Sequence, residues 1–222
     1  MLVELPVFSE IYGPIIFLFF MPKYFTTNRT SLLPETKNKF PINISGNWID
    51  ARNIKVNCPW LESWLLDASS LTERLQTHCQ TFRLEVIGYQ KHPVAPKDAL
   101  KINCNPNEIV IREVVLLGDG VPWVFAHTII PQVLFENGCS NLAKLGDEPL
   151  SNVIFSDANF LRQPFELTTL EINNSLLSDL SISISQILWG RRSVFKYKEH
   201  KMMIEEVFLP SSPAYAGLKN LN

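Results

Sequence analysis

Apolar residues recur with a helical spacing in one part of the chain, directly after Pro59. Tryptophan and leucine occupy positions 60, 61, 64 and 65, which form one face of a helix, and Pro59 suits the first turn of that helix. The tetrapeptide Ser70-Leu71-Thr72-Glu73 is a capping box and predicts a second helix that runs through Leu75. The two short helices would form a helix-turn-helix hairpin, and the backbone N–H groups of Leu71 and Thr72 would suit an anion.

In the segments that follow, apolar residues alternate or form β-branched runs, which is typical of strands. Phe82 to Val86 alternates with period two, and Ile109 to Leu117 is rich in valine and isoleucine. The sequence Gly118-Asp119-Gly120 would turn the chain back into a strand from Val121 to Ile130. These residues predict an antiparallel hairpin.

A second hairpin is predicted near the carboxyl end. Residues 192–197 and 202–209 have the pattern of strands, and they flank a polar turn at 198–201. Between the two hairpins, residues 150–155 and a stretch within 175–188 are expected to be helical. Hairpins with helices between them predict an α+β fold, in which a single antiparallel β-sheet carries flanking helices.

The amino-terminal residues follow neither pattern. An apolar run at 15–21 is bounded by prolines, so it is far shorter than the roughly 20 residues of a membrane-spanning helix. It would pack on the core or on another copy, or else serve as a weak membrane-surface anchor. Residues 26–57 are polar with no sustained period, as in a connecting segment. We therefore expect an extension at 1–55, a domain at 56–217 and a short tail at 218–222.

Composition and charge narrow the class of protein. The 222 residues are 46% hydrophobic and carry 20 Lys+Arg against 22 Asp+Glu, a net charge of −2. This composition allows a sizeable core, and it argues against a disordered chain and against a nucleic-acid partner. The 4 cysteines are far apart and no secretory signal precedes them, which favours unpaired thiols in a reducing compartment. The histidine spacing matches no metal motif and no nucleotide-binding glycine motif occurs, so neither a metal nor a cofactor is expected.

Charged residues interrupt strands that are otherwise apolar. Arg112-Glu113 stands in one strand and Glu205-Glu206 in another. Since neighbouring side chains on a strand face opposite ways, one member of each pair should point inward and the other toward solvent. An inward guanidinium and an inward carboxyl would bracket a small ligand that carries a carboxylate, whereas a buried Arg–Glu ion pair or solvent-facing charges would give the same pattern. The basic sequence Gly190-Arg191-Arg192-Ser193 is expected as a compact turn, either a solvated strand start or a holder of an anionic substrate.

Several short segments, in the same order along most of the chain, resemble the chorismate pyruvate-lyase (4-hydroxybenzoate synthase) family, in particular its members from cyanobacteria and plastids. Each segment alone is a weak signal, and their common order makes the resemblance strong. The segments lie between about Pro59 and Tyr215 and comprise Trp64-Leu65-Leu66 with Ser70-Leu71-Thr72; Ile111-Arg112-Glu113-Val114-Val115-Leu116; Gly120-Val121-Pro122-Trp123; Thr128-Ile129-Ile130-Pro131; Leu145-Gly146 with Pro149-Leu150; Leu188-Trp189-Gly190-Arg191-Arg192-Ser193; and Glu206-Val207-Phe208-Leu209-Pro210 with Ser212-Pro213.

The resemblance implies an internal ligand site on one face of the antiparallel sheet, closed by helix-turn-helix flaps. Arg112 would pair with the ring carboxylate of the ligand and Glu206 would meet its 4-oxygen end, so both are candidate catalytic residues. Backbone groups of Leu71 and Leu150 would complete the substrate-binding contacts. Two roles stay open for Glu206, namely a proton donor and a hydrogen-bond partner.

The resemblance also implies a lyase that converts chorismate into 4-hydroxybenzoate and pyruvate, feeding quinone biosynthesis. Aromatisation drives this reaction, so no cofactor is needed. We expect a monomer without a stable membrane span, in the plastid (chloroplast) stroma if the gene is organellar and otherwise in the cytoplasm. The alternative is a non-catalytic binding or sensor protein for a small phenolic acid on the same fold. Two departures from the family pattern leave it open, His127 in place of arginine and Ser151 in place of glycine.

Overall fold

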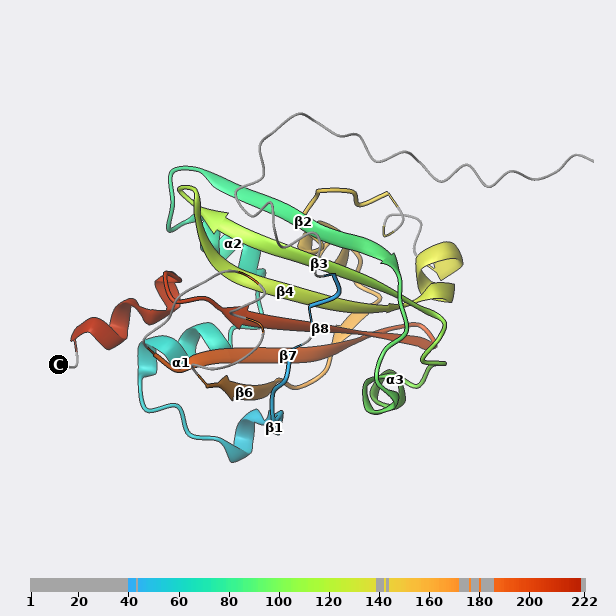
Figure 1. Ribbon diagram of the computed structural model, residues 1–222, viewed down its shortest axis with the longest axis horizontal. Helices are drawn as coiled ribbons and strands as arrows, with labels where there is room; N and C mark the ends of the chain where they lie inside the picture. Colours follow the sequence, from blue (N-terminus) through green and yellow to red (C-terminus); the bar gives the residue numbers. More distant parts are fainter. Residues whose placement is uncertain are drawn as a thin grey trace, which may run out of the picture.

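One large antiparallel sheet forms the centre of the molecule (Figure 1). The computed structural model describes residues 40–42, 44–138, 142, 144–171, 176, 180 and 186–220. The strands are β1 (Ile49–Asp50), β2 (Phe82–Lys91), β3 (Ile109–Gly118), β4 (Val121–Pro131), β5 (Phe160–Arg162), β6 (Glu166–Leu170), β7 (Leu188–Tyr197) and β8 (His200–Phe208). Their order across the sheet is β1-β6-β7-β8-β4-β3-β2, and β5 pairs with β7 beside this path. The predicted α+β class on a single antiparallel sheet is confirmed.

Both predicted hairpins are present. The chain turns between β3 and β4 at Asp119 and Gly120, whose φ angles of 51° and 79° are those of a tight turn between twisted strands. The second turn is shorter than expected, because Lys198 and Glu199 alone separate β7 from β8. Residues 190–193 were expected as a basic turn, and this expectation is wrong: they lie inside β7, which begins at Leu188.

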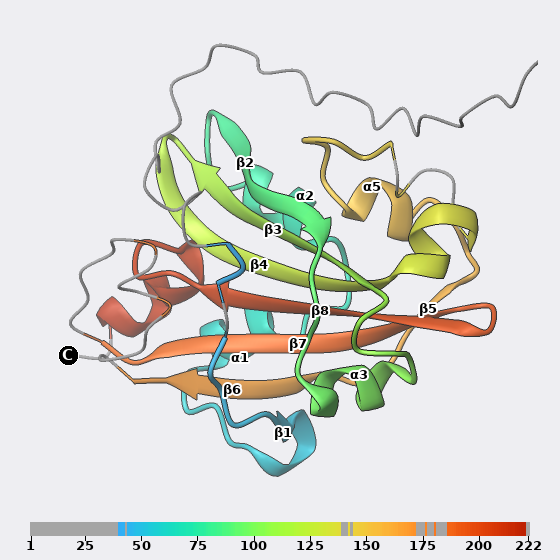
Figure 2. The same cartoon turned by 45° about the vertical axis from the view of Figure 1, so that its right-hand side comes forward.

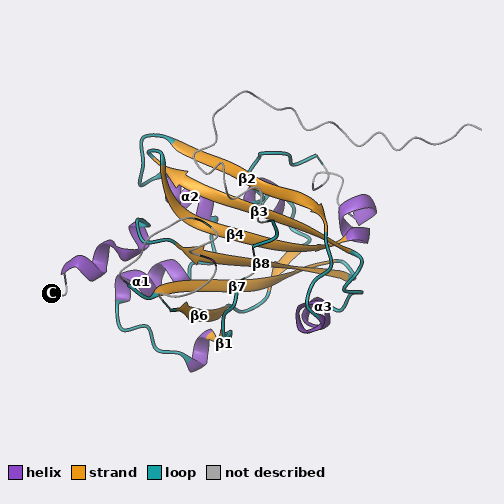
Figure 3. Cartoon of the chain, in the orientation of Figure 1, coloured by secondary structure: helices purple, strands orange, loops and turns teal. Residues whose placement is uncertain are grey.

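The helices are short and lie at the edges and on the faces of the sheet (Figure 3). They are α1 (Pro59–Leu65), α2 (Leu71–Gln76), α3 (Pro96–Ile102) and α5 (Ser151–Ile154), with 3-10 helices at Ala51–Asn53 and Pro213–Asn220 and a π-helical turn at Leu134–Gly138. Helix α1 begins at Pro59 as predicted, and the Ser70 hydroxyl caps α2 by accepting the Glu73 N–H at 3.3 Å. Among the described residues, no helix is long and apolar enough to cross a membrane.

Several sequence predictions fall on residues outside the described part of the chain. The apolar run at 15–21 is one of them, together with most of the helix predicted within 175–188. Leu188, the last residue of that predicted helix, instead begins β7.

Helices α1 and α2 lie on one side of the sheet, whereas α3 lies on the other side together with the stretch that leads into β1 (Figure 2). This stretch, residues 40–50, crosses the sheet where two strands carry glycine. A Cβ at Gly88 would collide with the Phe40 ring, and a Cβ at Gly190 would lie 3.3 Å from Trp48. The boundary predicted at residue 55 stays a prediction, although residues 40–50 pack directly on the sheet.

Because both faces are covered, the expectation that one charge of each pair points to solvent is wrong. Arg112 and Glu113 are both buried, with exposed fractions of 2% and 0%. Glu205 is buried too, and the Glu206 side chain is only 16% exposed. Adjacent charges therefore point to opposite faces, as strand geometry requires, and each face encloses its own set of charged groups.

Candidate functional site

A pocket opens between the sheet and helices α2 and α5. Strands β2, β3, β4, β7 and β8 contribute to its floor, and the lining is largely apolar. All of the predicted site residues line this pocket, namely Leu71, Arg112, Leu150 and Glu206.

Arg112 lies on the pocket face of β3, where the segment before α5 holds its guanidinium. Its Nη2 donates to the carbonyl of Glu148 at 2.8 Å and to that of Gly146 at 3.3 Å. The guanidinium carbon lies 5.6 Å from the centre of the Tyr89 ring. These contacts fix the direction of a cation in a pocket that is otherwise mostly apolar.

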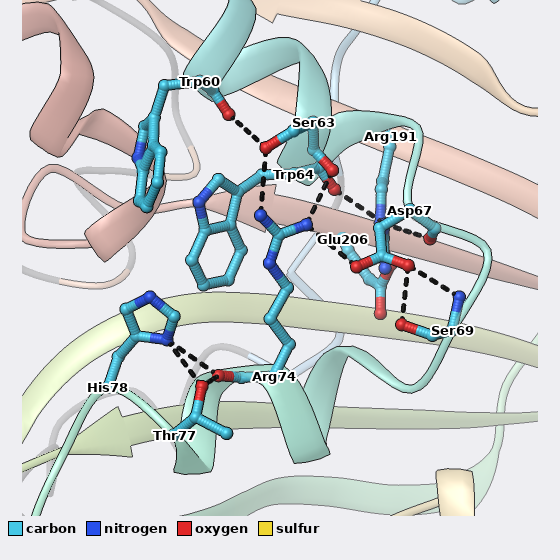
Figure 4. Close-up of polar contacts among 10 residues, drawn as sticks. All are labelled: Trp60, Ser63, Trp64, Asp67, Ser69, Arg74, Thr77, His78, Arg191 and Glu206. Carbon is cyan, nitrogen blue, oxygen red and sulfur yellow. Dashed lines mark hydrogen bonds and ion pairs between the residues drawn. The ribbon is translucent and has the colours of Figure 1, made fainter.

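Glu206 lies on the pocket face of β8 and forms an ion pair with its neighbour on β7. Its Oε2 accepts a hydrogen bond from Nε of Arg191 at 2.6 Å. Arg191 also donates through Nη1 to the carbonyls of Trp64 and Asp67, both at 2.9 Å (Figure 4). Arg191 thereby connects the candidate catalytic carboxylate to the end of α1 and the loop that follows it.

That loop has its own support within the helix hairpin (Figure 4). Arg74 on α2 donates to the Ser63 carbonyl at 2.6 Å and to Asp67 at 2.8 Å, and its guanidinium lies 4.0 Å above the Trp64 ring. Burial raises the pKa of Asp67, but hydrogen bonds from Ser69 and Arg74 outweigh it and lower that pKa overall. The wall of the pocket formed by α2 is therefore pinned by ionic contacts.

Arg162 is a second cation in the pocket lining, and sequence reasoning missed it. It ends the short strand β5, which pairs with β7 at Phe195. Its guanidinium carbon lies 4.4 Å from the ring centre of Phe195, and its Nη1 donates to the Ser193 hydroxyl at 3.1 Å. Burial lowers the pKa of Arg162 to about 10. A lone arginine in a three-residue strand gives no pattern that would have identified it.

The opposite face of the sheet holds a separate set of charges. His127 Nδ1 lies 2.7 Å from Oε1 of Glu113, and the backbone N–H of Ile42 donates to the same oxygen at 2.7 Å. Arg192 donates to Glu205 at 3.1 Å and to Glu166 at 2.8 Å. His127, the expected departure from the family pattern, therefore faces away from the pocket.

The charges around His127 decide its protonation. Burial disfavours the charged ring, but the hydrogen bond to Glu113 and the negative charges of Glu205 and Asp98 outweigh burial, so the pKa of His127 is raised. The pKa of Glu205 is also raised, because burial exceeds the opposing effects of His127 and Arg192. These groups form a charged cluster within the core.

Comparison with known proteins gives a consistent result. Residues 43–218 match the family model described as chorismate lyase. A probable chorismate pyruvate-lyase from Pseudoalteromonas atlantica is 39% identical over 173 residues, which cover 76% of this chain and 88% of the relative. Proteins with the same description from Shewanella sp. strain W3-18-1 and Shewanella loihica are 36% and 31% identical, each over 80% of this chain and over 95% and 94% of the relative.

Solved structures share the fold at much lower identity. The effector domain of PhnF from Mycobacterium smegmatis is 14% identical, with a TM-score of 0.51 over 65% of this chain and 91% of that domain. The structure of PhnF itself, from the same organism, gives a TM-score of 0.52 at 13% identity over 65% of each chain. These likenesses concern the fold alone.

Proposed function

This chain belongs to the chorismate lyase family, and from that premise we propose that its pocket releases pyruvate from chorismate. The protein is a carbon–oxygen lyase that converts chorismate into 4-hydroxybenzoate and pyruvate. The observation that carries the proposal is the placement of Arg112 and Glu206 in one largely apolar pocket. The Arg112 guanidinium can bind a carboxylate and the Glu206 carboxylate can accept a hydrogen bond, so together in a mostly apolar pocket they suit a small aromatic acid.

The reaction requires the protein to orient the substrate and to manage protons. The ether bond at ring carbon C3 breaks, the hydrogen on C4 leaves as a proton, and the electron pair it leaves completes the aromatic ring. The enolpyruvate that departs takes up a proton and becomes pyruvate. Because aromatisation supplies the driving force, the pocket needs to hold the carboxylates, exclude water and stabilise the charge that develops on the leaving oxygen.

Arg112 would hold the ring carboxylate. A guanidinium is always charged and can donate two parallel hydrogen bonds to a carboxylate. The guanidinium donates to the carbonyl groups of Glu148 and Gly146, which precede α5, and these bonds fix its orientation. A fixed guanidinium would in turn orient the substrate. Backbone groups of Leu71 and Leu150, on the opposing walls of the same pocket, would complete the contacts.

Glu206 would meet the oxygen on C4. Glu206 forms an ion pair with Arg191 at 2.6 Å, which favours its ionised form. An ionised carboxylate only accepts hydrogen bonds, so the ion pair supports a role for Glu206 as acceptor from the C4 hydroxyl rather than as proton donor. Its Oε1 makes no hydrogen bond to any described residue, so one oxygen remains for the ligand.

Binding of a phenolic acid without turnover is the second candidate function. One of the two departures from the expected family pattern supports it, because Ser151 lines the pocket. His127 gives it no support, because that side chain lies on the other face of the sheet.

The proposal also covers the cellular compartment and the oligomeric state of the protein. The relatives compared above come from bacteria, so they give no support to a plastid relative, and we propose the cytoplasm as the compartment. We propose a monomer as the active unit. The 4-hydroxybenzoate released would feed quinone biosynthesis, and no nucleic acid is required.

The test is to incubate the purified protein with chorismate and to quantify 4-hydroxybenzoate and pyruvate together. We expect equal amounts of both, with kcat/KM at least about 100-fold lower in Arg112→Ala and in Glu206→Ala. Arg52→Ala is the control, because Arg52 is exposed and pairs with Asp50 far from the pocket. Bound 4-hydroxybenzoate without product formation by the wild-type protein would favour the binding function.

A further inference from the structure

Arg162 is a cation of the pocket lining that has no carboxylate partner among the described residues. Arg191 and Arg192, on the neighbouring strand, each form an ion pair with a glutamate within 3.1 Å. Arg162 has no carboxylate within 4.0 Å among the described residues, and its hydrogen bond there goes to the neutral Ser193 hydroxyl. Its Nε is buried and has no hydrogen-bond partner in that part of the chain. A buried guanidinium without a counter-charge is costly unless a ligand supplies one.

Aromatic rings hold this guanidinium in place. Phe195, Phe165 and Phe155 surround it, at 4.4, 4.9 and 5.6 Å from its central carbon to the ring centres. The rings stabilise the cation through their faces but offer no acceptor in the plane of its N–H groups. Apart from the hydrogen bond to Ser193, the N–H groups of Arg162 are therefore left for an anion.

The position of Arg162 in the pocket matches the second acid group of the substrate. Chorismate carries one carboxylate on its ring and another on the enolpyruvyl group, which is attached to the ring carbon next to the one that bears the hydroxyl. Glu206, proposed at the hydroxyl, lies close enough to Arg162 for its negative charge to favour the charged guanidinium. With Arg112 on the ring carboxylate, Arg162 lies near the end of the substrate that carries the enolpyruvyl group.

We infer that Arg162 binds the enolpyruvyl carboxylate of chorismate and thereby selects the substrate over the product. This inference rests on the proposed lyase function and adds the residue that reads the second acid group. 4-Hydroxybenzoate has no such group, so it binds through Arg112 and Glu206 alone. Arg162 contributes to holding the substrate until the ether bond breaks and contributes nothing to the affinity of the aromatic product.

The test compares substrate and product in the same variants. In Arg162→Gln, kcat/KM for chorismate falls about 10- to 100-fold, because a charge-assisted hydrogen bond is lost, while the inhibition constant of 4-hydroxybenzoate changes by less than about twofold. Arg112→Gln is the matched control, and it weakens both ligands. Arg162→Lys keeps the charge and restores part of the loss, and it replaces Arg162→Gln if that variant fails to fold.

A parallel weakening of chorismate and 4-hydroxybenzoate in Arg162→Gln would overturn the inference, because it would show a general packing role. Unchanged affinity for both would overturn it as well. Failure of the lyase function is recognised separately, as absence of product from the wild-type protein. In that case calorimetric titration of chorismate and 4-hydroxybenzoate into the wild-type protein and Arg162→Gln still decides whether Arg162 reads the second carboxylate.

Discussion

Among the single residues, His127 shows how strongly this core depends on buried charge. The imidazole lies 2.7 Å from Glu113 and is 4% exposed, so water contributes little to its stabilisation. Nearby carboxylates favour the protonated ring and raise the pKa of His127 in the folded protein. An unfolded chain lacks these neighbours, so protonation and folding are coupled at this position.

The first prediction concerns pH. Because the folded pKa of His127 lies above its ordinary value of 6.5, the stability it contributes is fully present below pH 6.5 and is lost as pH rises through the folded pKa. Urea unfolding from pH 6 to pH 9 should therefore show falling stability in the wild-type protein and a flatter profile in His127→Gln. His92→Gln, in a loop where the ring bonds the Pro93 carbonyl, serves as control and should keep the wild-type slope. Identical slopes in all three proteins would contradict this account.

The sequence revealed the pairs of adjacent charged residues within the strands, but it did not reveal which side chains surround them. Periodicity left open which charge of each pair points inward, whereas the family resemblance assigned Arg112 and Glu206 to the ligand site, and both line the pocket. The partners of these residues were not predictable, because Arg191 reaches Trp64 and Asp67 from more than a hundred positions along the chain. Arg162 was missed for a related reason, since its significance depends on three phenylalanines that come together only in the fold.

At the scale of secondary structure, Arg191 connects three elements, namely β7, β8 and α1. It extends from β7, donates to the Glu206 carboxylate on β8, and donates to the carbonyls of Trp64 in α1 and Asp67 in the loop that follows. The strands and the α2 cap were predictable because period-two alternation and a capping box are local signals. Tertiary contacts of this kind leave no such signal.

The second prediction concerns this junction. Arg191→Met should lower the free energy of unfolding by about 3 kcal/mol, because it removes one partner of a largely buried ion pair and leaves two carbonyls without their donor. Lys101→Met is the matched control, since Lys101 pairs with Glu166 while remaining 32% exposed, and it should cost less than about 1 kcal/mol. Denaturant unfolding measures both. Equal, small losses would show that Arg191 is dispensable for the junction.

The whole molecule depends on a covering segment that its sequence did not reveal. Residues 40–42 and 44–50 belong to a segment without a sustained period, which predicted only a connection, yet Ile42 is 1% exposed and donates its N–H to Glu113. Strand β1 adds two residues to the edge of the sheet beside β6. This cover explains why the face opposite the pocket is closed, and periodicity could not predict it because the residues pack singly rather than as one face of a helix or strand.

The third prediction tests the domain boundary. A chain that begins at residue 56 should be less stable than one that begins at residue 40 by at least about 3 kcal/mol, because it loses the Ile42 hydrogen bond, the β1 pairing and the packing of Phe40 and Trp48. Urea unfolding of the two chains provides the comparison. Equal stability would instead support the boundary at residue 55.

The doubled charges along the strands also limit how this protein can evolve. Strands β3, β7 and β8 each carry two adjacent charged residues, Arg112-Glu113, Arg191-Arg192 and Glu205-Glu206, and each pair serves both faces of the sheet. A slip of one residue would exchange the two faces along the whole strand. Deletion of one codon in β3 would therefore place a carboxylate in the pocket at the position where the carboxylate of the substrate needs a cation. These strands can accept substitutions one at a time, whereas changes in length must be confined to the loops.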